Sequence, residues 1–351
     1  MPMNVRGYAA MSASAPLAPF RFERRDPRAD DVEIEILYCG VCHSDIHTVR
    51  DDWGPARYPV VPGHEIIGRV VSVGGAVKRF KAGDRVGVGC LVDSCRQCAP
   101  CGRGLEQYCA AGATLTYNDQ DRHDQRPTYG GYSDRIVVSD RFVLMVPEGL
   151  DLRGAAPLLC AGITTWSPLR HWNAGPGAQV AIVGLGGLGH MGLKLAKALG
   201  AEVTLFTRTP GKEADARRLG AKHVVLSTDA AAMKALRGRF DLIVDTVPNV
   251  HDLNPYVPTL ALDGSLVLVG YLGGLEPAVN SVPLILGRKA VAGSVIGGLP
   301  ETQEVLDFCG QHGIAADVEV IPIAKINEAY ERMIRSDVKY RFVIDMATLE
   351  A

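Results

Sequence analysis

A buried strand that runs directly into a glycine-rich turn constrains the fold of this chain more than any other feature. The strand is predicted at Gln179–Val183, and the turn that follows it reads GLGGLG from Gly184 to Gly189. A helix is predicted at 190–199. A turn of this kind between a strand and a helix is typical of a parallel sheet with helices on both faces.

Strands and helices continue to alternate after this turn. Apolar runs at 202–206, 242–244 and 265–269 are separated by segments of helical length. This alternation predicts an α/β fold with a doubly wound parallel sheet. We expect this second domain to span residues 151–296 and to begin with a helix over 151–172, where Ala and Leu are frequent.

The first part of the chain has a different pattern. Short apolar runs broken by Gly, Pro and Asp occupy 33–37, 68–74, 84–88 and 135–138. They predict a mostly β domain over residues 1–150. The last segment, 297–351, has a predicted helix at 301–306 and a strand at 341–344, and we expect it to return to that domain.

Composition excludes several classes of function. The 351 residues are 47% hydrophobic and 22% charged, and the net charge is −2. We therefore expect no nucleic-acid partner and no membrane partner. The chain has nine cysteines, and we find no secretion signal, so metal binding is a better explanation than disulfides. The expected compartment is the cytoplasm.

The glycine turn predicts a dinucleotide site. Gly184 allows the tight turn, Gly186 lets the backbone approach a pyrophosphate, and Gly189 permits close helix packing. An NAD site usually places a carboxylate after the second strand, but this chain has none at 206–212. It has hydroxyls and two cations that suit a 2′-phosphate, which predicts NADP(H), unless the two cations are simply solvated. The predicted contacts are Gly184, Leu185, Gly186, Gly187, Leu188, Gly189, Thr207, Arg208, Thr209 and Lys212.

Four cysteines within fifteen residues predict a metal site. Cys95, Cys98, Cys101 and Cys109 form a C-x2-C-x2-C-x7-C run. Four thiolates complete the tetrahedral shell of Zn²⁺, which makes a structural site. An iron–sulfur cluster is the alternative, but the last spacing differs from that of a ferredoxin.

A second set of candidate ligands is dispersed along the chain. Cys42, His64 and Cys160 would give zinc two thiolates and an imidazole and leave one position open, as in catalytic sites. Each of them alone would be read as a structural residue. Cys39, Cys90 and Cys309 fit no ligand pattern, and we expect them to be buried core residues.

From about residue 5 to 345 the chain resembles the zinc-dependent medium-chain alcohol dehydrogenases, and most closely the cinnamyl alcohol dehydrogenase branch. The resemblance rests on CGVCHSD at 39–45, GHE at 63–65, PLLCAGIT at 157–164, the glycine turn, the four-cysteine run, DTVP at 245–248, GS at 293–294 and YRFV at 340–343. It implies a GroES-like catalytic domain, a Rossmann domain, an active site in the cleft between them, two Zn²⁺ per chain and NADP(H).

The resemblance also implies residue roles. Glu65 would lie behind the catalytic zinc and coordinate it transiently, and Asp45 would orient His64. Ser44 would take the alcohol proton and pass it through the cofactor ribose to His47. The further cofactor contacts that it implies are His43, Ser44, Thr164, Thr246, Gly270, Gly293, Ser294 and Arg341, the last as a cation for the pyrophosphate.

The expected activity is hydride transfer between NADP(H) and a primary alcohol or aldehyde. The plant lignin enzymes tend to carry Trp where Leu115 stands here, so we expect a broad range of aliphatic and aromatic substrates, with Trp53 lining the pocket. The alternatives are a polyol dehydrogenase, against which Cys160 argues, a non-catalytic nucleotide-binding relative, and an iron–sulfur electron carrier. The family suggests a homodimer formed through the edge of the Rossmann sheet.

Overall fold

The structure is a computed structural model that describes residues 3–270 and 273–349. The described residues form two compact units, of which the first runs up to Cys160 and resumes at Gly297 and the second spans Ala161–Ile296. We predicted that residues 151–160 open the second domain, but they lie in the first unit. The reason is a tertiary contact, because the Ala316 N–H donates to the Gly154 carbonyl at 3.0 Å.

A mixed sheet forms the centre of the first unit. Within the described residues its strand order is β16-β17-β3-β4-β5-β9, and β8 also pairs with β3. Two smaller sheets pair β1 with β2 and β6 with β7. The strands are β1 (Met3–Ala9), β2 (Ala18–Arg24), β3 (Asp31–Val41), β4 (Ile66–Val73), β5 (Arg85–Val88), β6 (Leu91–Asp93), β7 (Thr114–Leu115), β8 (Arg135–Ser139), β9 (Leu144–Met145), β16 (Val318–Pro322) and β17 (Arg341–Asp345).

The long strand β3 shows why this part of the sequence forms a sheet. Val32, Ile34 and Ile36 are buried, whereas the alternate Glu35 is exposed. This period of two places one apolar face against the core. Because β3 pairs with β17, β4 and β8, it holds together segments from both ends of the chain.

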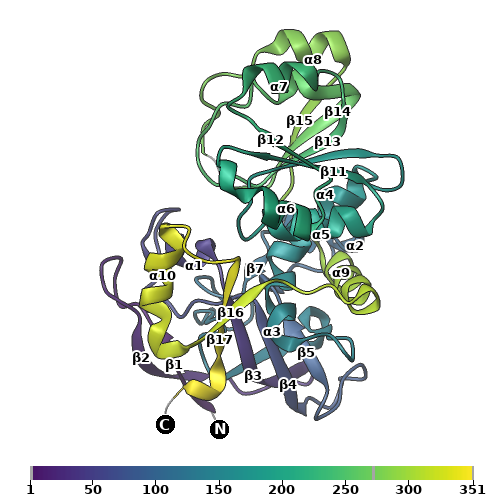
Figure 1. Ribbon diagram of the computed structural model, residues 1–351. Coiled ribbons are helices and arrows are strands. Elements are labelled where there is room, and N and C mark those ends of the chain that lie inside the picture. The colour runs from purple at the N-terminus through teal and green to yellow at the C-terminus, as the bar shows by residue number, and fades with distance from the viewer. Residues whose placement is uncertain (1–2, 271–272, 350–351) are drawn as a thin grey trace. The chain divides into compact units, whose positions relative to one another are not determined.

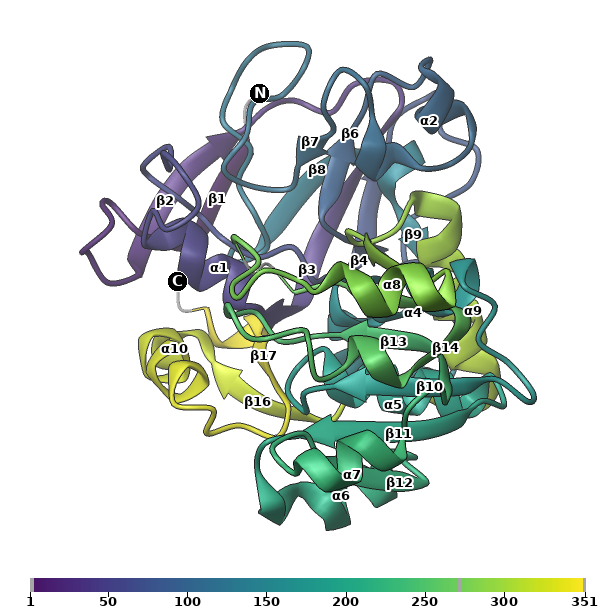
Figure 2. The ribbon, with the colours of Figure 1, turned by 90° about the horizontal axis from the view of Figure 1, so that it is seen from above.

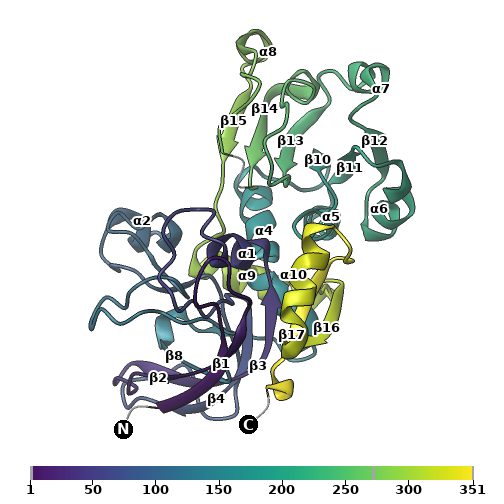
Figure 3. The ribbon, with the colours of Figure 1, turned by 90° about the vertical axis from the view of Figure 1, so that its left-hand side faces the viewer.

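Short helices surround this sheet. They are α1 (His43–Val49), α2 (Ala99–Gly102), α3 (Leu152–Ala155), α9 (Leu299–His312) and α10 (Ile326–Ile334), with 3₁₀ turns at Glu106–Tyr108, Asp140–Phe142, Ala156–Leu159, Ile323–Lys325 and Met346–Thr348. Helix α10 lies alongside β16 and β17 (Figure 3). Arg332 of α10 pairs with Glu319 and lies over the ring of Phe342, which fastens the helix to both strands.

The second unit is built on a parallel sheet. Its order in the described residues is β12-β11-β10-β13-β14-β15, and strands β13, β10, β11 and β12 can be followed in turn in Figure 2. The strands are β10 (Gln179–Val183), β11 (Glu202–Thr207), β12 (His223–Leu226), β13 (Phe240–Asp245), β14 (Leu260–Leu268) and β15 (Ala290–Gly293). The order reverses at β10, which confirms the predicted doubly wound fold.

Helices cover both faces of this sheet. Figure 1 shows α4, α5 and α6 along one face and α7 and α8 along the other. The helices are α4 (Ala161–His171), α5 (Gly189–Ala198), α6 (Glu213–Leu219), α7 (Ala230–Ala235) and α8 (Ser281–Gly287), with 3₁₀ turns at Pro210–Lys212 and Val257–Thr259. Phe206, Phe240 and Leu266 are buried in the core between the sheet and the layer that contains α7 and α8. Because both faces are covered, the strands read as continuous apolar runs.

The helix predicted over 151–172 is wrong as a single element. Helix α3 ends at Ala155, a 3₁₀ turn covers Ala156–Leu159, and α4 begins at Ala161. Pro157 stands at the start of the 3₁₀ turn, and Cys160 has φ −132° and ψ −71°, outside the helical region. Because of this break, Cys160 belongs to neither the 3₁₀ turn nor α4.

None of the helices described is long and apolar enough to span a membrane.

Candidate metal centres and cofactor site

The first unit brings the dispersed ligands together at one buried point. Cys42 precedes α1, His64 and Glu65 precede β4, and Cys160 lies between the 3₁₀ turn and α4. One ligand atom from each of these residues lies within 4.8 Å of every other. The side chains are almost wholly buried, so a metal held here would be shielded from bulk water.

The spacing of these atoms fits zinc. Two thiolates bound at 2.3 Å to tetrahedral Zn²⁺ stand about 3.8 Å apart, and the Cys42 and Cys160 sulfurs are 3.8 Å apart. Among the described atoms, Glu65 Oε2 is buried without a hydrogen-bond partner. A buried carboxylate oxygen without a hydrogen bond is costly, and coordination to a metal would satisfy it. The donor set therefore suits a catalytic type of zinc site.

Two glycines make room for this cluster. A Cβ at Gly40 would collide with the Glu65 carboxylate. Gly63 has φ +102°, and a Cβ there would stand 2.7 Å from the Cys39 sulfur. Larger residues at either position would displace the loop that carries His64 and Glu65.

Asp45 ties the ligand-bearing loops to one another. Its carboxylate accepts the backbone N–H groups of Cys42 at 2.8 Å and of Gly63 at 3.1 Å. His64 Nδ1 lies 3.4 Å from Oδ1, and the Tyr132 hydroxyl donates to Oδ2 at 3.1 Å. The sequence pointed to Asp45 as the residue that orients His64, but it gave no sign of Tyr132.

Arg341 has a partner that the sequence did not indicate. Its guanidinium donates to Glu65 Oε1, and the two side chains are 4% and 0% exposed. Arg341 also lowers the pKa of Cys42, although the hydrogen bond from Cys160 is the larger cause. Both effects favour the thiolate that a metal requires.

The residues predicted for proton transfer lie on or beside α1. Ser44 is half-buried, and its hydroxyl is 3.5 Å from the Cys42 sulfur. His47 Nδ1 is 2.8 Å from Asp52 Oδ2, and its ring stacks on Trp53 at 4.8 Å. His43 is exposed, with its ring 6.5 Å from that of His47. Trp53, predicted to line the pocket, is 43% exposed.

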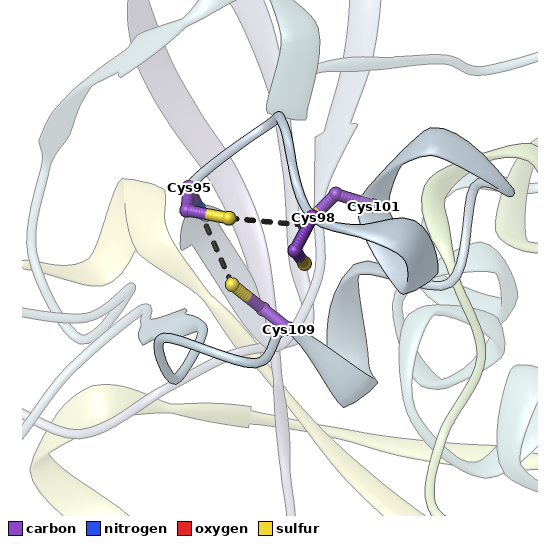
Figure 4. A group of neighbouring side chains, drawn as sticks. All are labelled: Cys95, Cys98, Cys101 and Cys109. Carbon is purple, nitrogen blue, oxygen red and sulfur yellow. Dashed lines mark hydrogen bonds between the residues drawn. The ribbon is translucent and has the colours of Figure 1, made fainter.

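The four-cysteine run forms a separate cluster. Figure 4 shows Cys95, Cys98, Cys101 and Cys109 gathered from neighbouring short segments around α2. Their sulfurs lie within 4.8 Å of one another, and Cys95 and Cys101 are 4.0 Å apart. Four thiols and no oxygen or nitrogen ligand suit a closed, structural zinc site.

Backbone N–H groups favour the thiolate form in this cluster. The N–H groups of Gln97 and Cys98 lower the pKa of Cys95 to about 6. The N–H groups of Cys101 and Ala110 likewise lower the pKa of Cys98. Burial, by contrast, raises the pKa of Cys101 to about 11. The loop thus favours anionic sulfur at Cys95 and Cys98, whereas Cys101 would lose its proton only when a metal binds.

The remaining cysteines divide into two kinds. Cys39 and Cys309 are fully buried, as predicted. Cys90 is half-exposed, and its thiol interacts with the sulfur of Cys160 and with the Leu159 carbonyl. It was predicted to be a core residue, but it lies beside the candidate ligand set of Cys42, His64 and Cys160.

The glycine turn of the second unit has the geometry of a phosphate-binding turn. Gly184 has φ +88°, and a Cβ at Gly189 would collide with the Gly184 carbonyl. A Cβ at Gly186 would meet no described atom within 4 Å, so the backbone there is open to a ligand. Helix α5 begins at Gly189 and directs its N–H groups at this turn.

The residues predicted to bind a 2′-phosphate directly follow or end β11. Thr207 is buried, and its hydroxyl accepts the Thr209 N–H at 3.1 Å. Arg208 is exposed, and Lys212 donates from Nζ to the Leu185 carbonyl at 3.0 Å. Lys212 thereby connects this segment to the glycine turn.

The other predicted cofactor contacts also belong to this unit, except His43, Ser44 and Arg341. Thr246 follows β13 and donates to the Val183 carbonyl at 2.7 Å. A Cβ at Gly270 would collide with the Val247 carbonyl, and the Ser294 N–H donates to Leu268 at 3.0 Å. Gly293 ends β15, and Thr164 is buried in α4. Gly293, Ser294, Thr246 and Gly270 lie at the carboxyl ends of the strands, where ligands of such sheets bind.

A dinucleotide-type sheet in one unit and a Cys-His-Cys metal set in the other define a class of protein, the metal-dependent dehydrogenases. Residues 28–148 match the family model of the alcohol dehydrogenase GroES-like domain, and residues 187–311 match that of the zinc-binding dehydrogenase domain.

Full-length relatives narrow this class. The chain is 54% identical to NADP-dependent alcohol dehydrogenase C of Mycobacterium bovis and 53% identical to aldehyde reductase YahK of Escherichia coli, over 99% of each chain. A solved cinnamyl alcohol dehydrogenase of Sorghum bicolor is similar over 99% of this chain and 100% of that one, with a TM-score of 0.95 and 47% identity. The chain belongs to the zinc-dependent medium-chain alcohol dehydrogenases, as its motifs predicted.

Proposed function

We propose that this protein is a zinc-dependent, NADP(H)-dependent alcohol dehydrogenase that acts mainly as a reductase of aliphatic and aromatic aldehydes. The observation that carries the proposal is the buried set of Cys42, His64 and Cys160, with sulfurs at the spacing of tetrahedral zinc. The names of the relatives in Mycobacterium bovis and Escherichia coli support the same cofactor and substrate class.

Three strong ligands leave one position of a zinc ion for the substrate oxygen. A zinc ion bound there would supply a Lewis acid that lowers the pKa of an alcohol or polarises an aldehyde carbonyl. Asp45 would hold His64 in the orientation that binds the metal. Glu65, whose Oε2 has no partner among the described atoms, would serve as a transient fifth ligand.

The chain also supplies groups for the proton. Ser44 lies beside Cys42 and would exchange the proton of the substrate hydroxyl. His47, hydrogen-bonded to Asp52 and partly exposed, would exchange that proton with solvent. We assign a second zinc to Cys95, Cys98, Cys101 and Cys109, with a structural role.

The test is the initial rate of NADPH and NADH oxidation with benzaldehyde and with a short aliphatic aldehyde, before and after a chelator removes the metal. We expect turnover with NADPH that is lost on metal removal and returns with Zn²⁺. No turnover of either aldehyde with either cofactor by the zinc-loaded protein would overturn the proposal.

We further propose a homodimer formed through β15, the outermost strand of the parallel sheet. Helix α8 carries exposed apolar side chains, including Ile285 at 75% and Leu286 at 78% exposure, and Val295 is exposed just after β15. Among the described residues β15 pairs with a strand on one side only. A second copy of the chain is the occupant that suits such an edge flanked by apolar side chains.

Light scattering after size-exclusion chromatography tests the dimer. The wild type should have twice the mass of the chain, and Ile285→Glu with Leu286→Glu should be monomeric. Met11→Glu, at an exposed apolar residue of the first unit, is the control and should stay dimeric. A monomeric wild type would contradict the proposal.

The cytoplasm remains the proposed compartment. Every cysteine of the chain is described, and none forms a disulfide. Two metal sites built from thiolates are compatible with a reducing environment. Fractionation of the native host with a cytoplasmic marker enzyme tests this assignment.

A further inference from the structure

An acidic side chain is buried at the carboxyl edge of the parallel sheet, outside the set of predicted cofactor contacts. Asp245 ends β13 and is 1% exposed. Its Oδ1 accepts the Val247 N–H at 3.1 Å, and its Oδ2 lies 2.9 Å from His251 Nε2. The loop after β13 is therefore folded back onto this carboxylate.

The hydrogen bonds of His251 fix its protonation. Nδ1 lies 2.8 Å from the Asn249 carbonyl, and Nε2 faces Asp245. A carbonyl oxygen and an ionised carboxylate can only accept, so both ring nitrogens carry a proton. His251 is thus an imidazolium that neutralises the buried charge of Asp245. In agreement, the bond to Asp245 raises the pKa of His251, although burial opposes the shift.

The Asp245–His251 pair lies close enough to the segment predicted to bind the 2′-phosphate for their charges to interact. Phe206 of β11 and Asp245 of β13 both pair with Val183 of β10, so Asp245 and Arg208, which follows β11 directly, lie near one another at the same edge of the sheet. The bond to Asp245 raises the pKa of His251, and the positive charge of Arg208 opposes this rise. The ring of Tyr256 lies between the two strand ends, with its centroid 6.3 Å from that of His251 and 5.4 Å from that of Phe206. The charges of Arg208 and Asp252 both act on Tyr256. Asp245, His251 and Arg208 therefore form one charge system that spans the ends of two strands.

The charge of Asp245 matters because a 2′-phosphate carries up to two negative charges. An uncompensated carboxylate near Arg208 would compete for that guanidinium and would repel the phosphate. A 2′-hydroxyl carries no charge, so the same carboxylate would affect an NAD-type ligand far less. Neutralising Asp245 thus favours one cofactor over the other.

We propose that His251 is a positioning and specificity-determining residue that cancels the charge of Asp245 and so keeps Arg208 available to a 2′-phosphate. This role rests on the proposed NADP(H) function. It assigns part of the cofactor preference to a residue that follows the strand next to the glycine turn, rather than to the usual position after the second strand.

The experiment compares two small probes, 2′,5′-ADP and 5′-AMP, which differ in the 2′-phosphate alone. Calorimetry gives the Kd of each for the wild type, for His251→Gln and for His251→Gln with Asp245→Asn. We expect His251→Gln to lower the preference for 2′,5′-ADP on the order of 5-fold, with little change for 5′-AMP. The double variant, which is neutral again, should recover most of the wild-type preference.

The outcomes separate this inference from the proposed function. A wild type that binds both probes equally would count against the NADP(H) assignment itself. A wild type that prefers 2′,5′-ADP, with His251→Gln keeping the same ratio, would overturn the role of His251. Equal weakening of both probes would also overturn it, because a purely structural residue would have that effect.

A second measurement uses only the wild-type protein. Binding is reciprocal, so a ligand that prefers the imidazolium must raise the His251 pKa. NMR titration of the wild-type histidine rings should show a larger upward shift for one ring with 2′,5′-ADP than with 5′-AMP. Equal shifts with the two probes would contradict the inference.

Discussion

Arg341 and Glu65 form a buried ion pair in which Glu65 also lies within 4.8 Å of the Cys-His-Cys ligand atoms. The residues come from β17 and from the loop before β4, which lie far apart in the sequence. Their charges are compensated where neither could be solvated, so loss of one partner leaves the other buried and unpaired.

We therefore expect Arg341→Met to destabilise the first unit by about 3–5 kcal/mol. Urea unfolding followed by the fluorescence of the zinc-loaded protein measures this change. Arg341→Met combined with Glu65→Gln removes both charges and should recover a large part of the loss. A single variant as stable as the wild type would mean that Glu65 is neutral in the folded protein.

Cys160→Ala should remove the zinc of the dispersed set. Because two ligands cannot hold a catalytic metal in place of three, we expect turnover to fall by orders of magnitude, while 2′,5′-ADP binding is retained. Elemental analysis should show one zinc per chain instead of two. Cys309→Ala, at a buried cysteine outside both clusters, is the matched control. Full activity of Cys160→Ala would refute the ligand assignment.

Cys98→Ser should act on stability rather than on the chemistry. A structural zinc contributes its binding free energy to folding, so the variant should lose one zinc, melt at a lower temperature and aggregate more readily. Thermal unfolding with and without added Zn²⁺ measures the effect. Arg103→Ser, at an exposed residue between Cys101 and Cys109, should behave like the wild type. The structural zinc assignment fails if Cys98→Ser keeps both zinc ions and its melting temperature.

Arg208→Ala should shift the cofactor preference toward NADH. A charge-assisted hydrogen bond to phosphate contributes about 1.5–3 kcal/mol, which corresponds to a loss of roughly 10- to 150-fold in kcat/KM for NADPH. The value for NADH should change little. The ratio of the two constants, measured with one aldehyde, checks this prediction, and an unchanged ratio would exclude Arg208 as the phosphate ligand.

Asp121 should make the first unit sensitive to acid. Burial raises its pKa, but hydrogen bonds and charge from Arg28 and Arg25 lower it to about 2, from 3.8. Because the folded pKa is the lower one, the stabilisation is complete above about pH 4 and is lost as the pH falls toward 2. Asp121→Asn should be less stable at pH 7 and lose less stability between pH 4 and pH 2 than the wild type. Glu148→Gln, at an exposed carboxylate, should follow the wild-type curve.

Local patterns predicted the elements that carry the cofactor site. The strand at Gln179–Val183 has the predicted bounds, and α5 begins at Gly189, beside the predicted start at His190. These features depend on neighbouring residues, because a buried strand, a positive φ at Gly184 and a helix start are encoded within a few positions. The four-cysteine run was visible for the same reason.

Long-range pairs could not be predicted in this way. Arg341 with Glu65 and Tyr132 with Asp45 join side chains far apart in the sequence. His251 and Asp245 are only six positions apart, but the loop that brings them together has no regular period that would specify the contact. The Ala and Leu residues around Cys160 favour a continuous helix by propensity, but Pro157 and the backbone of Cys160 break it. The backbone there is decided by tertiary contacts of the first unit.

The separation of the two ligand sets along the chain has a consequence for how the protein acquires its metal. Cys95 and Cys109 are 14 positions apart, whereas Cys42 and Cys160 are 118 positions apart. Closing the longer loop costs about 2 kcal/mol more in chain entropy, and it also requires β3 and β4 to be in place. The four-cysteine lobe can therefore take up zinc while the chain is still emerging from the ribosome, and the dispersed site loads after the first unit has folded.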